Sequence, residues 1–225
     1  MPEFTPDLQL QTLYSLNGMG RIVSTREPNS SPGPRFSLIR APSGCAWSVH
    51  AEIPDELAIE LGKLAADEPR IQDFELEPVH ARHYTSLLGG RIDAGPAFTF
   101  PEYMAQSTGL VEIRNVGQLE RYFRGWTEDE LPGRAPILAI TEGEDAISIC
   151  YCARLSPIAA EAGVDTAEAF RGRRLAGRVT AAWVSAIRAS GRLPIYSTSW
   201  GNAASRAVAR RLRLELRATD WSIHA

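Results

Sequence analysis

The stretch FRGRRLAG, residues 170–177, decides the fold prediction, because it stands between a predicted strand at 158–166 and a predicted helix. From Gly172 the apolar residues keep helical spacing for about 18 residues, and Gly191 ends the helix as a C-cap glycine. The first turn of a helix has unpaired N–H groups and a partial positive charge. Small residues leave room for a diphosphate there, and arginines add charge. The stretch therefore predicts an anion site.

Two common nucleotide-binding motifs fit this stretch poorly. Gly172 and Gly177 have P-loop spacing, but Arg178 and Val179 stand where that motif has Lys and Ser or Thr. Without the hydroxyl there is no Mg²⁺ ligand, which argues against an NTPase. The pattern GxGxxG is absent, which argues against a Rossmann dehydrogenase. An arginine-rich helix start that faces solvent stays open as the alternative.

The distribution of charge also favours an anionic ligand. The formal net charge is -3, yet Arg171 to Arg217 contains eleven arginines and a single acid, Glu215. Such a basic stretch is typical of sites for cofactor phosphates or nucleic acid. The arginine stripe in the predicted helix 202–212 lacks interleaved aromatic residues, so we expect no nucleic-acid partner.

Composition predicts a globular protein of the cytoplasm. The hydrophobic fraction is 44%, and no run approaches the roughly 18 apolar residues of a membrane span, so no membrane partner is expected. The first ten residues include two acids and no apolar leader, which predicts no secretory signal. Three cysteines make a poor disulfide framework, and we expect Cys150 and Cys152 to pack in the core. His80 and His83 have helical spacing, but no further ligand completes a metal motif.

The first half predicts an α/β domain. Thr5 and Pro6 begin a helix as N-cap and first residue. Further predicted elements are strands at 36–40 and 46–53 and helices at 54–64 and 78–88. Residues 91–106 contain Pro96 and Pro101 and are predicted to be a loop that holds the domain boundary. We therefore divide the chain into domains 1–108 and 109–225.

The second half predicts a strand-rich unit with a hairpin turn at 142–145. The predicted strands are 110–113, 136–140, 146–155, 158–166, 194–198 and 214–223. The predicted helices begin at Asn115, Gly172 and Asn202.

In this order of elements the chain resembles the GNAT (N-acetyltransferase) superfamily over residues 110–225. The family motif R/Q-x-x-G-x-G/A joins a splayed strand to a helix that binds the CoA diphosphate, and Arg171 and Ala176 match it. Residues 162–166 resemble the family's fourth strand, and 195–205 resemble its fifth strand and the helix that follows. The resemblance implies a GNAT fold of class α/β (α+β), with a mixed, mostly antiparallel sheet and flanking helices, preceded by the N-terminal α/β domain.

The resemblance implies acetyl-CoA as cosubstrate and no metal. Asn202 is predicted to cap a helix and to contact the cofactor arm, with capping alone as the alternative. The predicted cofactor-binding residues are Val164, Thr166, Arg171, Gly172, Arg173, Arg174, Leu175, Ala176, Gly177, Asn202 and Ser205.

Attack of an amine on a thioester needs a deprotonated amine and a stabilised oxyanion. Glu161 is the first candidate for the base, followed by Glu112 and Glu142. A backbone N–H near Val164 is expected to meet the oxyanion. The candidate hydroxyl donors are Ser197, Ser199 and Ser205.

Three departures from the family pattern stand out. Arg174 replaces the first motif glycine, and the link 167–170 lengthens the approach to Arg171. Ala209 stands where many members carry the tyrosine that protonates the departing thiolate.

The resemblance implies an N-acetyltransferase acting on a primary amine of a small molecule or peptide. The rival, which Arg174 and the missing tyrosine motivate, is a CoA-binding regulatory module without catalysis. The first half is expected to supply substrate contacts or a dimer surface, with a homodimer as the candidate assembly.

Overall fold

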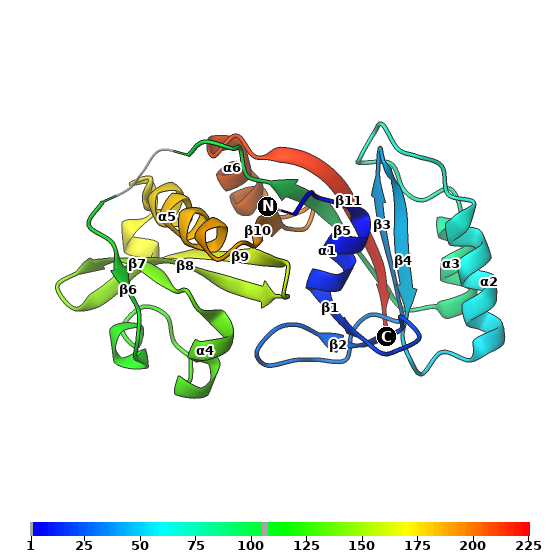
Figure 1. Ribbon diagram of the computed structural model, residues 1–225, viewed down its shortest axis with the longest axis horizontal. Helices are drawn as coiled ribbons and strands as arrows, with labels where there is room; N and C mark the ends of the chain where they lie inside the picture. Colours follow the sequence, from blue (N-terminus) through cyan, green and yellow to red (C-terminus); the bar gives the residue numbers. More distant parts are fainter. Residues whose placement is uncertain (1, 105–107) are drawn as a thin grey trace.

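The computed structural model describes residues 2–104 and 108–225 and contains a large curved sheet with helices on both faces (Figure 1). The strand order is β4-β3-β11-β5-β10-β9-β8-β7-β6, and β1 and β2 form a separate hairpin. The elements in residues 2–104 are α1 (Pro6–Leu13), β1 (Tyr14–Leu16), β2 (Ile22–Thr25), β3 (Phe36–Ala41), β4 (Gly44–Val49), α2 (Asp55–Ala66), α3 (Ala81–Leu88) and β5 (Arg91–Thr99). The elements after it are β6 (Val111–Glu112), α4 (Leu131–Arg134), β7 (Leu138–Glu142), β8 (Asp145–Leu155), β9 (Ala159–Thr166), α5 (Leu175–Ala189), β10 (Leu193–Ser197), α6 (Ala203–Arg211) and β11 (Glu215–His224), with 3₁₀ turns at Val116–Gln118, Glu128–Glu130 and Glu168–Phe170.

Strands from the two halves of the chain alternate in the middle of the sheet. β11 pairs antiparallel with both β3 and β5, and β5 pairs antiparallel with β10. β9 and β10 form the one parallel pair among the described strands of this sheet. The prediction of a mixed, mostly antiparallel sheet is confirmed. The sheet is continuous across the sequence division at 108/109, so both halves build its centre.

The predicted loop at 91–106 is wrong over its first nine residues, which form β5. Pro96 misled the prediction, because proline weakens strands. A Cβ at Gly95 would lie 1.7 Å from the Thr198 carbonyl oxygen, so only glycine allows the loop after β10 to approach. Pro96 lies one residue before the stretch of β5 that pairs with β10, so its missing N–H removes no ladder bond. The last two residues of the predicted loop lie outside the described residues.

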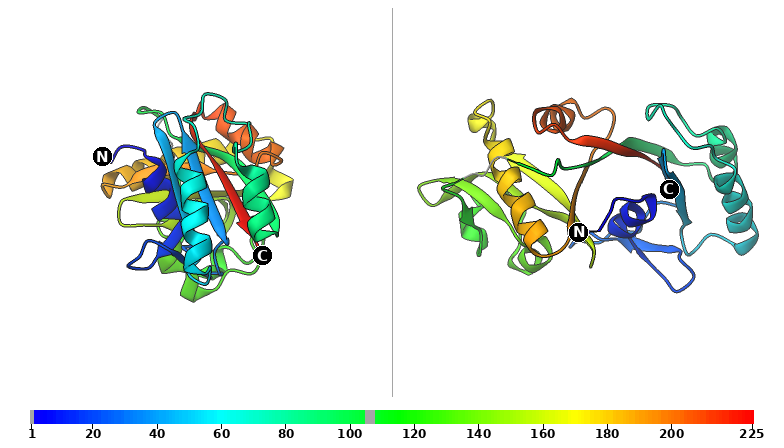
Figure 2. Two further views of the ribbon diagram at one scale, coloured as in Figure 1. Left: turned by 90° about the vertical axis from the view of Figure 1, so that its right-hand side faces the viewer. Right: turned by 45° about the horizontal axis from the view of Figure 1, so that its top comes forward.

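The helices cover the two faces unequally. α5 packs on β7 to β10 and buries Trp183 completely. α2 and α3 cover β3, β4 and β11 on the same face, through a cluster around Trp221. α1 covers the opposite face and contacts β3, β4, β8 and β9, so it lies between the two ends of the curved sheet (Figure 2).

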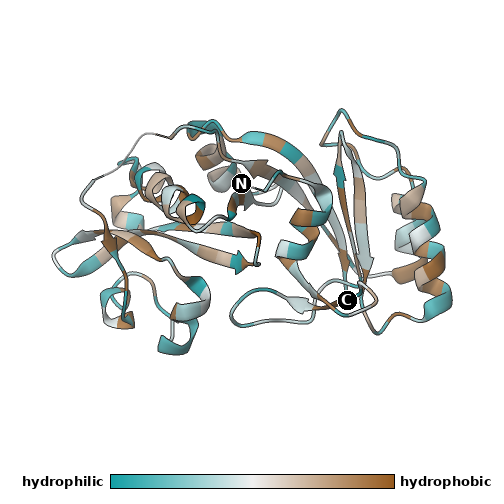
Figure 3. Ribbon diagram, in the orientation of Figure 1, coloured by the Kyte–Doolittle hydropathy of each residue, from teal (hydrophilic) through white to brown (hydrophobic). Residues whose placement is uncertain are grey.

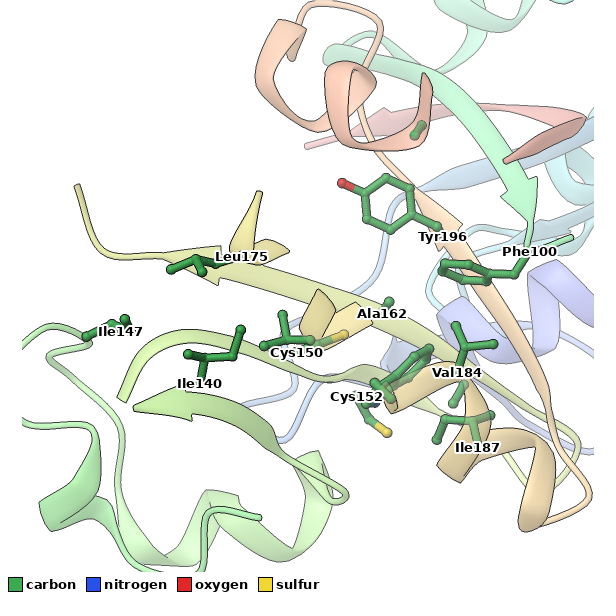
Figure 4. Packing of buried hydrophobic residues seen from close by; sticks show 14 of the residues in the cluster. Phe100, Ile140, Ile147, Cys150, Cys152, Ala162, Leu175, Val184, Ile187 and Tyr196 are labelled. Carbon is green, nitrogen blue, oxygen red and sulfur yellow. The ribbon is translucent and has the colours of Figure 1, made fainter. Parts of the chain in front are cut away.

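Burial follows these layers. Figure 4 shows Cys150 and Cys152 among Ala162, Val184 and Ile187, beneath α5. Both cysteines are fully buried, which confirms that they pack in the core. Figure 3 shows hydrophilic residues interspersed with hydrophobic ones along β11, although this strand lies between two others.

Local chemistry explains where the helices begin. Thr5 accepts a hydrogen bond from the Leu8 N–H at 3.1 Å and Asn202 accepts one from the Ser205 N–H at 3.0 Å, so both predicted caps are confirmed. The helix predicted from Asn115 is wrong: only the 3₁₀ turn Val116–Gln118 forms, without a side-chain cap at Asn115. Gly117 lowers the helix propensity of this turn.

Among the described residues, no helix is long and apolar enough to cross a membrane.

Candidate functional site

The turn before α5 carries two residues with positive φ. Gly172 has φ 80°, and Arg174, the N-cap, has φ 61° and ψ 19°. Because of these angles the helix begins at Leu175, three residues after the predicted start at Gly172. They also explain why a glycine at position 174 suits this turn, because the left-handed region costs a residue with a Cβ roughly 1–2 kcal/mol.

The first turn of α5 presents free backbone donors. The N–H groups of Leu175, Ala176 and Gly177 precede the first i→i−4 bond of the helix, and the Arg174 side chain caps none of them. The helix is 15 residues long, so its N-terminus carries the partial positive charge of a full macrodipole. An anion placed there would gain hydrogen bonds and charge complementarity.

These donors face a cavity of about 510 Å³, here termed the α5 cavity, between the end of β9, the start of α5 and one side of α6. Most residues predicted to bind a cofactor line it: Val164, Thr166, Arg171, Gly172, Arg174, Leu175, Ala176, Asn202 and Ser205. Arg173 instead stacks on the Phe170 ring, 4.9 Å from its centroid. Gly177 lines an adjoining cavity of about 320 Å³.

Sequence reasoning missed several lining residues. Arg211 lines both of these cavities and adds a third guanidinium to those of Arg171 and Arg174. Helical spacing from Ser205 through Val208 to Arg211 was the available signal, because residues three apart share one helix face. The other missed residues are Asp165, Phe170, Tyr196, Ala204, Ala207 and Val208.

The two strands beside the α5 cavity separate. β9 and β10 pair from Leu193 with Ala159 to Ile195 with Glu161. Beyond this point β9 continues to Thr166 and β10 to Ser197 without pairing to each other. The edge of β9 that carries Val164 is therefore unpaired on the side of β10, and this unpaired stretch between the two strands is here termed the gap.

Glu161 lies at the last pair before this gap, on the face opposite the α5 cavity. Only 2% of Glu161 is exposed, and its carboxylate accepts hydrogen bonds from Ser197 Oγ and, at 2.5 Å, from the Arg154 guanidinium. Arg154 also pairs with Glu27. Burial opposes the charge of Arg154, but the two carboxylates raise its pKa, so the guanidinium stays charged.

The other candidate acids and donors are dispersed. Glu112 is on the edge strand β6 and pairs with Arg114 at 3.2 Å, and Glu142 is at the exposed end of β7. Neither lines the α5 cavity. Ser205 does line it, whereas Ser197 and Ser199 line a different cavity on the opposite face.

Tyr196 occupies the space between β10 and α6. Its phenol lines the α5 cavity and its hydroxyl donates to the Ser205 carbonyl at 3.4 Å. Figure 4 shows the ring on the same face of the sheet as Phe100. Ala209 is buried in the same cluster. Burial raises the pKa of Tyr196, so its hydroxyl keeps its proton at neutral pH.

Metal ligands are not gathered at this site. In residues 2–104 and 108–225, no group of three His, Cys, Asp or Glu side chains could hold a metal ion. His80 and His83 instead lie beside Asp67 and Glu60.

The comparisons agree with this geometry. Residues 137–219 match the family described as GNAT acetyltransferase, and this match spans β7 to the first half of β11. Among curated proteins, a sequence search finds no match.

Two of the solved structures that match this chain share its fold at low sequence identity. A GCN5-related N-acetyltransferase-like protein from Streptococcus suis is 14% identical, with TM-score 0.50, over 90% of this chain and 89% of that chain. A Drosophila protein is 11% identical, with TM-score 0.50, over 97% and 86%. A GNAT-family chain from Novosphingobium aromaticivorans is 17% identical, with TM-score 0.48, over 59% of this chain, and the match spans 64% of that chain.

The left-handed conformation of Arg174 predicts a difference between two variants. Arg174→Gly should have a free energy of unfolding about 1 kcal/mol above that of Arg174→Ala, because both lose the guanidinium but only glycine adopts this φ without strain. Urea unfolding measures both. An alanine variant as stable as the glycine variant would contradict the assigned backbone angle.

Proposed function

Since residues 137–219 match the GNAT acetyltransferase family, we propose that the chain is an N-acetyltransferase that moves an acetyl group from acetyl-CoA to a primary amine by direct attack. One observation supports this most. The free N–H groups of α5, three arginines and the gap between β9 and β10 all open on the α5 cavity.

The residues of the cavity fit a phosphate-bearing cosubstrate. Arg171, Arg174 and Arg211 would hold its phosphates together with the first N–H groups of α5. The open edge of β9 at Val164 offers backbone groups to an amide-containing arm, and Asn202 lies across the cavity from it. When bound, acetyl-CoA supplies an activated acyl carbon; the net change forms a C–N bond, breaks the C–S bond and moves a proton from the amine to the thiol.

The chain offers a group for each end of that proton transfer. Glu161 is placed at the gap and is the proposed acceptor of the amine proton, directly or through water. Tyr196 presents a protonated hydroxyl inside the α5 cavity and is the proposed donor to the thiolate. Tyr196 lies on β10. In this role it would replace the family's tyrosine, whose expected position on α6 is occupied here by Ala209.

Calorimetry and a turnover assay test the function together. We expect CoA to bind the purified protein and thiol release from acetyl-CoA to depend on an added amine. Tight CoA binding without thiol release on any amine of a broad panel would favour the regulatory module. Absence of CoA binding would reject both readings.

Glu161→Gln should lower kcat about 10²-fold or more while leaving the affinity for CoA within about threefold, since general-base catalysis contributes roughly 10²–10⁴-fold. The variant keeps an oxygen to accept from Ser197. Full activity at every pH would eliminate Glu161 as the base.

Tyr196→Phe should lower kcat about tenfold or more with an acetyl donor, because the hydroxyl in the α5 cavity is lost while the ring stays. A donor whose leaving thiol is more acidic should restore much of the rate, since that thiolate needs less protonation. Equal losses with both donors would assign Tyr196 a structural role only.

A further inference from the structure

A second cavity of about 360 Å³ lies on the other face of the sheet and is here termed the β11 cavity. It is lined by Tyr14 beside α1, Arg154 of β8, Ser197 of β10 and Asp220 of β11. Tyr196 and Ser197 are consecutive in β10 and point to opposite faces. The α5 cavity and the β11 cavity therefore lie on opposite faces of β10, beside the place where its pairing with β9 ends.

Asp220 is the acid of this cavity without a counter-ion. It is enclosed by protein, yet part of its surface faces the cavity. No basic side chain lies within 4 Å of its carboxylate among the residues described, and its one hydrogen-bond partner, Ser37 Oγ, is at 3.5 Å.

The neighbouring charges are already paired with one another. Asp93 pairs with Arg91 and lies 3.5 Å from His224. Glu161 and Glu27 share Arg154. Burial raises the pKa of Asp220 to about 7, and the carboxylates of Glu161 and Asp93 add to the rise while Arg154 opposes it. The cavity therefore has an unbalanced negative charge when Asp220 is ionised.

Tyr14 supplies a second polar group. The side chain is only 6% exposed and lines the cavity. Its hydroxyl lies beside the Ser37 hydroxyl, which is also the hydrogen-bond partner of Asp220. Burial and the nearby Asp220 raise the pKa of the phenol, so the hydroxyl stays protonated and can accept a hydrogen bond from a cation.

The sheet register separates Asp220 from the gap. Ser197 pairs with Ala97 and Asp220 with Gly95, on opposite sides of β5. With strands about 4.8 Å apart and about 3.4 Å per residue, the Cα atoms of Ser197 and Asp220 are roughly 12 Å apart. Their side chains point to the same face, and a short alkyl chain can bridge the space between them.

We infer that the β11 cavity selects acceptors with a second positive charge several bonds from the reactive amine, and that Asp220 is the counter-ion of that charge. The reactive nitrogen then lies at the gap beside Ser197 and Glu161, and the distal ammonium lies against Asp220 and Tyr14. This inference rests on the proposed acetyltransferase function. The corresponding class of acceptor is an aliphatic diamine.

Three acceptors of matched length test the inference: diaminopentane, hexylamine and aminohexanoate, which end in a cation, a methyl group and an anion. A hydrogen bond to a charged group contributes about 1.5–3 kcal/mol, so we expect kcat/KM for diaminopentane to exceed that for hexylamine roughly 10- to 100-fold, and aminohexanoate to be poorest. Asp220→Asn should remove the preference for diaminopentane and leave hexylamine and CoA affinity within about threefold. An equal preference in wild type and variant would overturn the inference.

Control variants separate charge recognition from folding. Tyr14→Phe keeps the net charge and should raise KM for diaminopentane about fivefold, as expected for one lost hydrogen bond. Asp55→Asn removes a carboxylate that is 83% exposed on α2 and should change no kinetic constant. If no acceptor is acetylated at all, the proposed acetyl transfer fails, and calorimetry then tests the cation site independently. Binding of diaminopentane to wild type but not to Asp220→Asn would still support the cation site. Equal binding to both proteins would reject it.

The ratio of kcat/KM for diaminopentane to that for hexylamine gives a further readout. Protonation of the reactive amine affects both acceptors alike and therefore cancels in this ratio. This ratio should fall towards one as the pH drops through about 7, where Asp220 becomes neutral. The groups that face Asp220 are Ser37 on β3, Asp93 on β5, Arg154 on β8, Glu161 on β9, Tyr14 and His224. Asp220→Asn should show a flat ratio near one, and a wild-type ratio that does not change with pH would contradict the role of Asp220.

Discussion

The end of pairing between β9 and β10 is the constraint on which the rest of this structure depends. Two adjacent parallel strands lose their ladder after Ile195 and Glu161, although both continue. The open edge exposes backbone groups on one side, and consecutive side chains of β10 reach two different cavities. The close approach of the loop after β10 to Gly95 fixes where β10 departs. The two cavities in which we propose that cosubstrate and acceptor bind thereby lie on opposite faces of one sheet.

The sequence could predict those parts of the site that local chemistry determines. A glycine- and arginine-rich turn before an amphipathic helix forms an anion site through its own backbone, so Arg171 and Ala176 were identified from neighbours in the chain. Asn202 was identified for the same reason, because a cap acts on the next turn. Element types followed hydrophobic periodicity wherever the segment was long, as in β8 and α5.

The parts that failed depend on distant partners. Gly95 and Pro96 predict a loop by themselves, and only the position of β10 and Thr198 makes them strand residues. Asp220 belongs to a final strand whose polar residues look like an ordinary exposed face. Its register against β3 and β5 turns it towards Tyr14 without bringing a basic side chain into ion-pair distance among the described residues, and no local pattern carries that information. Helical spacing from Ser205 could have predicted Arg211 as a lining residue, whereas the motif before α5 could not.

The place of β11 has a consequence for the synthesis of the chain. This strand is made after every other strand, yet it lies between β3 and β5, and the Ser37–Asp220 contact spans 183 residues. Until β11 leaves the ribosome, β3 and β5 each present an unpaired edge, and such edges favour association with other strands. A nascent chain therefore forms most of the lining of the α5 cavity before the β11 cavity exists, and chaperone protection of the two edges matters most before β11 emerges.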